Sequence, residues 1–141
     1  LAVDPATLET VDTFTIRGEG WGLCFDGERV IRSDGTEMLR FHDPRNMRVT
    51  DSLMVTLAGV PQRNLNELEF ARGVIWANQW QSNRILAIDP ASGAVLRVYD
   101  MSALNPGRGS ELNGIAYDSD RDLFLVTGKN WPLTYSIDIK L

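Results

Sequence analysis

Apolar and polar residues alternate along the chain in short runs, and turn-forming residues separate these runs. The clearest example is the apolar run Ile85–Ile88, which is followed by Asp89-Pro90 and leads into further spaced apolar residues at 94–99. Alternation with a period of two is typical of β-strands, because successive side chains point to opposite faces of a sheet. Asp-Gly, Asp-Pro and Ser-Gly pairs between the runs are typical of turns. Apart from one helical turn expected at 101–104, the pattern predicts an all-β fold.

Two sequence units repeat along the chain. The first is an alternating apolar stretch ending in Asp-Pro, which occurs near residues 1, 39 and 85, with a degenerate copy at 135–139. The second lies between these copies, and its corresponding positions Gly22, Glu67 and Gly114 are 45 and 47 residues apart. Repeats of roughly 40–50 residues that read as short strands are typical of the four-stranded blades of a β-propeller.

We therefore expect one partial β-propeller domain over residues 1–141. Its expected parts are strands C and D of an incomplete blade at 1–16, blades at 17–60 and 61–105, and an incomplete blade without strand D at 106–141. Such an arc stays open unless a partner or missing residues complete it. Because open sheet edges favour association, we expect either a homo-oligomer or further N-terminal blades of the same protein.

Composition excludes several classes of function. The chain has 141 residues, 43% of them hydrophobic, and a formal net charge of −5. Nucleic-acid binding needs a basic surface, and a bilayer-spanning helix needs ~20 apolar residues in a row; the sequence shows neither. One cysteine and one histidine do not provide the ligand cluster of a zinc site. We therefore predict no nucleic-acid partner, no membrane partner and no metal site.

Polar and aromatic residues gather at one end of the predicted strands. In an antiparallel blade the first strand begins at the edge where the second ends, so both places share one face of the propeller. The residues concerned are Trp21, Asn66, Glu67 and Asn113 at the strand starts, and residues 33–35, 78–80 and 127–129 at the strand ends. We expect a ligand to bind on this face. Packing between blades explains Trp21 and Trp80 equally well, and the mid-strand Trp76 is expected in the core.

Five stretches resemble the plant and bacterial glutaminyl-peptide cyclotransferases, in the order in which that family has them. They are Gly20–Leu23, Leu65–Phe70, Ile75–Gln81, Leu112–Tyr117 and Thr127–Pro132. The resemblance implies a five-bladed β-propeller, of which this chain would be the C-terminal three-fifths. It also implies a reaction in which the α-amine of an N-terminal glutamine attacks its own side-chain amide, releasing ammonia and leaving pyroglutamate. No cofactor or catalytic metal is implied, and a structural ion in the channel is left open.

The resemblance also implies roles for individual residues. Lys129 and Asn66 would be catalytic, and Trp21 and Trp80 would enclose the glutamine side chain. Two further residues, Glu67 and Asn113, would contact substrate or order the channel. The family's proton-shuttling glutamate is expected ahead of residue 1. Either Glu67 or Glu69 could replace it only if its side chain points into the pocket, and the sequence leaves that question open.

The expected substrate is a peptide that begins with glutamine. Two alternatives remain at this point: a non-catalytic fragment that binds a peptide N-terminus or small ligand, and an oligomeric interaction scaffold, because one fold supports many functions. The resemblance favours a periplasmic or secreted location.

Overall fold

The computed structural model describes residues 1–141 as short antiparallel strands with one 3-10 turn, η1, at Ser102–Leu104. The strands are β1 (Ala2–Val3), β2 (Thr10–Asp12), β3 (Leu23–Phe25), β4 (Val30–Arg32), β5 (Met38–His42), β6 (Val49–Met54), β7 (Thr56–Leu57), β8 (Val60–Pro61), β9 (Leu65–Ala71), β10 (Val74–Gln79), β11 (Arg84–Ile88), β12 (Val95–Asp100), β13 (Glu111–Asp118), β14 (Leu123–Lys129) and β15 (Tyr135–Ile137). The all-β prediction is confirmed.

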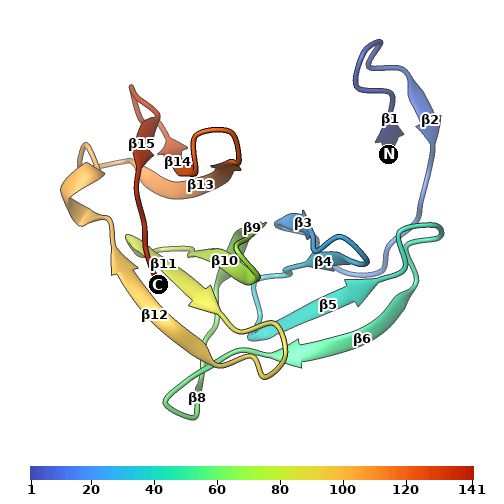
Figure 1. The fold of residues 1–141 in the computed structure, drawn as a ribbon, viewed down its shortest axis with the longest axis horizontal. Helices are drawn as coiled ribbons and strands as arrows, with labels where there is room; N and C mark the ends of the chain where they lie inside the picture. The colour runs from blue at the N-terminus through green and yellow to red at the C-terminus, as the bar shows by residue number, and fades with distance from the viewer.

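Three sheets follow one another along an open arc (Figure 1). The first is a four-stranded meander, β3-β4-β5-β6; the second is the meander β9-β10-β11-β12; and the third contains β13-β14-β15. The first strand of the second sheet, β9, contacts the first strands of its neighbours, β3 and β13. These three strands therefore form the inner side of the arc, as in a propeller.

The second sheet is buried on both faces, because its alternate residues enter two separate cores. Ile75 and Ala77 pack with residues of the first sheet, whereas the intervening Trp76 packs with residues of the third. Trp76 is fully buried, and its ring centroid lies 4.6 Å from that of Phe124. The expected core position of Trp76 is thus confirmed, and the two cores hold the three inner strands at fixed spacing.

The first sheet has one apolar buried face and one face that is only partly covered. On β3 the middle residue Cys24 enters the core, whereas Leu23 and Phe25 are each 53% exposed on the opposite face. The paired strands β1 and β2 stand away from this sheet, across the opening of the arc from β15 (Figure 1). At this end of the arc, the apolar side chains of Leu23 and Phe25 therefore remain exposed beside the buried polar residues Arg32 and His42.

A hairpin of β7 and β8, which the residue pattern did not predict, follows the first sheet. Its two-residue turn, Ala58-Gly59, has φ angles of 50° and 80°. Two consecutive left-handed residues define the type I′ turn that suits a tight hairpin. Alanine is an uncommon residue at such a φ, which is why the sequence carries no clear turn signal here.

Candidate functional site

The inner strands β9 and β13 are irregular at the residues that the sequence marks as candidates. On β9, both Asn66 and Glu67 lie opposite the single residue Asn78, because the register shifts there. On β13, the register shifts between Leu112 and Gly114, leaving Asn113 as the extra residue. A bulge of this kind redirects side chains and is frequent beside functional sites.

In the first sheet, Trp21 holds the strand-start position that Asn66 and Asn113 hold in the other two sheets. Hydrogen bonds beside Trp21 join the first sheet to the second. The Trp21 N–H donates to the Ser33 carbonyl, and the Gly22 N–H donates to Ser33 Oγ at 2.9 Å. Ser33 Oγ in turn donates to the Asn66 carbonyl of β9 at 2.6 Å. The buried Ser33 hydroxyl thus sets the position of Trp21 relative to Asn66.

Four residues from the three sheets line one small cavity of about 190 Å³. They are Trp21, Asn66, Trp80 and Lys129. Trp21 precedes β3 and Asn66 lies on β9, whereas Trp80 and Lys129 stand at the ends of β10 and β14. Residues that the sequence scatters over more than a hundred positions are therefore brought together by the packing of adjacent sheets.

The two indoles form an aromatic corner in this cavity. Their ring centroids lie 5.3 Å apart, with an interplanar angle of 85°, an edge-to-face arrangement that aromatic pairs favour. Trp21 packs directly over Gly35, where an added Cβ would lie 2.6 Å from the ring. Gly35 also has a φ of 80°, so both the backbone turn and the seating of Trp21 require glycine there.

One carboxylate, which sequence reasoning did not single out, joins the two residues at the strand ends. Glu111 Oε2 accepts a hydrogen bond from Trp80 Nε1 at 3.2 Å and lies 3.8 Å from Lys129 Nζ. Glu111 is also the cross-strand partner of Lys129. The sequence could have indicated Glu111 through the strand register. Once the hairpin turn is located at 119–122, the register places residue 111 opposite residue 129.

The two candidate carboxylates of β9 have different surroundings. Glu69 is engaged: its Oε2 accepts the Tyr117 N–H at 3.0 Å and its Oε1 accepts the Phe70 N–H at 2.8 Å. Glu67 instead lines a second cavity, of about 330 Å³, together with Trp21. Burial raises the pKa of Glu67, and the charge of Glu69 raises it further. Glu67 is thus the β9 carboxylate that faces open space beside the indole corner.

Asn113 lines neither of these cavities. It occupies the bulge of the third sheet, in the place that Asn66 occupies in the second. Asn113 and Asn66 occupy equivalent positions, which is why the sequence repeat identifies both. The cavity, however, lies around Asn66, between the first and third sheets.

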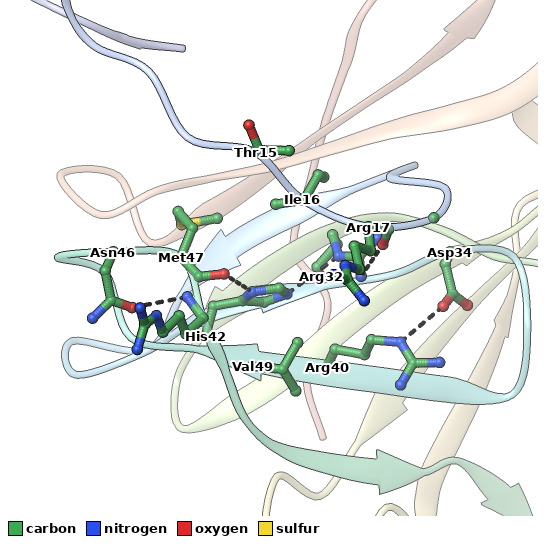
Figure 2. Close-up of a pocket in the computed structure, with 12 residues that line it drawn as sticks. Thr15, Ile16, Arg17, Arg32, Asp34, Arg40, His42, Asn46, Met47 and Val49 are labelled. Atoms are coloured by element: carbon green, nitrogen blue, oxygen red, sulfur yellow. Dashed lines mark hydrogen bonds and ion pairs between the residues drawn. The ribbon is translucent and has the colours of Figure 1, made fainter.

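A larger cavity of about 570 Å³ lies over the partly covered face of the first sheet; Asp34 lines it, but none of the residues to which a catalytic or substrate-binding role was assigned does. Figure 2 shows Arg32 between His42 and Arg17, and Arg40 directed toward Asp34. Arg32 Nε donates to His42 Nε2 at 3.2 Å, and Arg40 Nε donates to Asp34 Oδ2 at 3.1 Å. The Arg32 and Arg40 side chains that line this cavity are therefore already hydrogen-bonded to other residues of the protein.

Comparison with known proteins shows the family to which the chain belongs. The sequence profile described as Glutamine cyclotransferase matches residues 1–139. The chain belongs to the glutamine cyclotransferase family. The resemblance seen in the five motifs is thereby confirmed.

Individual relatives agree with this assignment. The chain is 45% identical over 129 residues to a glutaminyl-peptide cyclotransferase of Arabidopsis thaliana, covering 86% of this chain and 40% of that protein. The crystal structure of the glutaminyl cyclase of Myxococcus xanthus superposes with a TM-score of 0.84 at 42% identity, covering 89% of this chain and 57% of that one. The chain thus spans about half the length of these relatives.

More distant structures show the fold alone. The dihydro-heme d1 dehydrogenase NirN matches with a TM-score of 0.57 at 16% identity, over 97% of this chain and 29% of its own. The β-propeller prediction is confirmed by the cyclase match together with the arc of sheets.

Two further features of the structure concern membranes and metals. No helical segment has the length and apolar character required to cross a bilayer. Groups of three or more His, Cys, Asp or Glu side chains arranged around a common point are also absent.

Proposed function

We propose that this chain forms the substrate-binding part of a glutaminyl-peptide cyclotransferase, which converts an N-terminal glutamine to pyroglutamate and ammonia. The observation that carries the proposal is the cavity lined by Trp21, Asn66, Trp80 and Lys129. Its volume of about 190 Å³ is below the range of roughly 300–1,000 Å³ that accommodates drug-sized ligands. It therefore suits the terminal side chain of a peptide rather than a long segment.

The cavity supplies what an intramolecular ring closure requires. The attacking amine and the amide carbon belong to the same residue, so the main task is to hold the folded rotamer in which they meet. Trp21 and Trp80 meet edge to face and would enclose the methylene groups of glutamine while excluding water. The Asn66 carboxamide offers both a donor and an acceptor, with which it would hold the substrate amide in register.

Lys129 would stabilise the charge that develops during the reaction. Attack of the α-nitrogen on the amide carbon forms the N–C bond and places negative charge on the amide oxygen. An ammonium near that oxygen lowers the barrier, because its attraction grows as the charge develops. Collapse of this intermediate breaks the bond to the amide nitrogen, which leaves as ammonia after taking up the proton lost by the α-amine.

Glu67 is the β9 carboxylate that we assign to the α-amine end of the substrate. It lines the cavity on the other side of Trp21, whereas Glu69 is bound to backbone N–H groups. A carboxylate whose pKa is raised by burial is better matched to proton transfer near neutral pH than an ordinary one.

The first test removes the Lys129 charge. Lys129→Ala should lower kcat for ammonia release about 100-fold, the typical cost of losing one oxyanion-stabilising group. Lys140→Ala is the matched control, because Lys140 pairs with Asp138 and lines none of the site cavities. Unchanged circular dichroism would show that both variants fold. Equal turnover in the two variants would refute the role of Lys129.

Substrate specificity distinguishes the enzyme from a non-catalytic binder. Ammonia release is measured with a peptide that begins with glutamine and with one that begins with asparagine, whose side chain is one methylene shorter. Release from the glutamine peptide alone supports the proposal. Saturable binding of that peptide without ammonia release would instead identify a binding module.

We further propose that the partly covered face of the first sheet is fully covered in the functional molecule, either by another blade of the same protein or by a second copy of this chain. The exposed Leu23 and Phe25 of β3 support this, because exposed apolar faces favour association. Light scattering after size exclusion should show assemblies larger than one chain. A stable monomer would contradict coverage by a second copy.

A further inference from the structure

Glu111 contacts two of the four residues that line the candidate site, although it was not among the predicted site residues. Its Oε2 accepts the Trp80 indole N–H at 3.2 Å and stands 3.8 Å from Lys129 Nζ. We propose that Glu111 is a positioning residue, which holds the Trp80 ring and the Lys129 ammonium in the orientation that receives an N-terminal glutamine. The substrate named here rests on the function proposed above.

The strand register explains why Glu111 reaches both groups. Glu111 and Lys129 are directly paired at the ends of β13 and β14, and paired residues in a sheet present their side chains on the same face. Trp80 comes from the neighbouring sheet, where its backbone N–H donates to the Asn64 carbonyl at 2.8 Å. The Glu111 carboxylate therefore links the second and third sheets through two residues that line the cavity.

Without this link, the Lys129 side chain and the edge of the Trp80 ring would each have more conformational freedom. A lysine side chain has a flexible four-carbon stem with four rotatable bonds, and it loses considerable rotamer entropy when it is held in one place. Trp80 is packed against Trp21, and a hydrogen bond to its indole N–H further restricts its two side-chain torsions. One carboxylate that engages both groups reduces this freedom before the substrate arrives, so less ordering remains to be done on binding.

The hydrogen bond should matter more than the ion pair. The side chains of Lys129 and Glu111 are 65% and 41% exposed, so water and salt screen the attraction between their charges. A hydrogen bond from the indole to a charged acceptor is stronger than one between neutral groups. We therefore expect Glu111 to act chiefly through Trp80, which forms a wall of the cavity, and to affect KM more than kcat.

Two substitutions separate the contributions. Glu111→Gln keeps an oxygen that can accept the indole N–H but removes the charge, whereas Glu111→Ala removes both. We expect kcat/KM for the glutamine peptide to fall roughly tenfold in the alanine variant, mostly through KM, and only about two- to threefold in the glutamine variant. Asp138→Asn is the matched control, because it removes one carboxylate from a surface pair, 3.1 Å from Lys140 Nζ.

A second readout needs no activity. The indole N–H signal of Trp80 in a ¹H–¹⁵N spectrum is identified by its loss in Trp80→Phe. This signal should move strongly in Glu111→Ala and weakly in Glu111→Gln, while the signal of the buried Trp76 stays in place in both. Movement of the Trp76 signal would instead report a general structural change and would contradict the local role.

The outcomes for the function and for the inference are distinguishable. If the parent chain releases ammonia and Glu111→Ala has the kcat/KM of Asp138→Asn, the positioning role is wrong while the proposed function stands. If the parent chain releases none, the proposed function fails for this chain, and the Trp80 signal alone decides the inference. An unmoved Trp80 signal in Glu111→Ala would then overturn it.

Discussion

Gly22 lies where the backbones of the first two sheets touch, and its replacement by alanine tests how the site is held together. A Cβ added at Gly22 would lie 2.3 Å from the Asn66 carbonyl oxygen and 2.8 Å from the Glu67 Cα. Both are backbone atoms of β9, which is fixed on its other side by pairing with β10. No flexible side chain can therefore move aside, and the two inner strands must separate.

The expected cost follows from two effects. Forcing extra volume into a packed interior costs about 1–3 kcal/mol. Separation of the strands also weakens the hydrogen bonds that join Gly22, Ser33 and Asn66, and each such bond contributes about 1 kcal/mol. We expect Gly22→Ala to lower the free energy of unfolding by about 2–4 kcal/mol, a large fraction of the 5–15 kcal/mol typical of a domain.

Equilibrium unfolding in urea, followed by tryptophan fluorescence and circular dichroism, measures this loss. With an m-value of about 2 kcal/mol/M, in the middle of the usual range for urea, the midpoint should fall by about 1–2 M. Gly20→Ala is the matched control, because its added Cβ would meet side-chain atoms alone: the end of Ile16 at 3.2 Å and Arg32 Cδ at an ordinary contact distance of 3.6 Å. We expect that variant to change stability by less than about 1 kcal/mol. Equal midpoints for the two variants would refute the argument that the inner strands touch through their backbones.

Two further predictions concern the same strands. Ser33→Ala should destabilise the chain by about 1–3 kcal/mol, because the buried Gly22 N–H and Asn66 carbonyl lose their shared partner; urea unfolding checks this, and an unchanged midpoint would show that the hydroxyl is dispensable. Burial raises the pKa of Glu67, so the folded chain binds that proton more tightly than the unfolded chain does. Stability is therefore lost as the pH rises above about 4.3, the ordinary pKa of a glutamate. Glu67→Gln should unfold at higher urea than the parent at pH 7 but at similar urea at pH 3.5, and a difference that does not depend on pH would contradict this assignment.

Much of the fold was predictable because its signals are local. Short runs of β-branched and aromatic residues between turn residues located the longer strands, such as Val74–Gln79, and the spacing of Gly22, Glu67 and Gly114 revealed the propeller repeat. The hairpin at 56–61 was missed because its turn places Ala58 at a left-handed φ of 50°. Only the second residue of that turn, Gly59, is a typical turn residue, so the local signal is weak.

The candidate site was predictable in part. By itself, the sequence determined that Trp21, Asn66, Trp80 and Lys129 stand at strand ends on one face, because turn residues and strand direction set this locally. Only the tertiary structure decided that these four share a cavity, whereas Asn113 lines neither of the site cavities.

The roles of the carboxylates were also decided only by the tertiary structure. Sequence spacing could not separate Glu67 from Glu69, or indicate that Glu111 joins Trp80 to Lys129. A single extra residue in a strand changes the direction of the side chains near it, and contacts between sheets depend on register and packing over the whole arc. These are properties of strands far apart in the chain, and for that reason only the folded molecule could settle them.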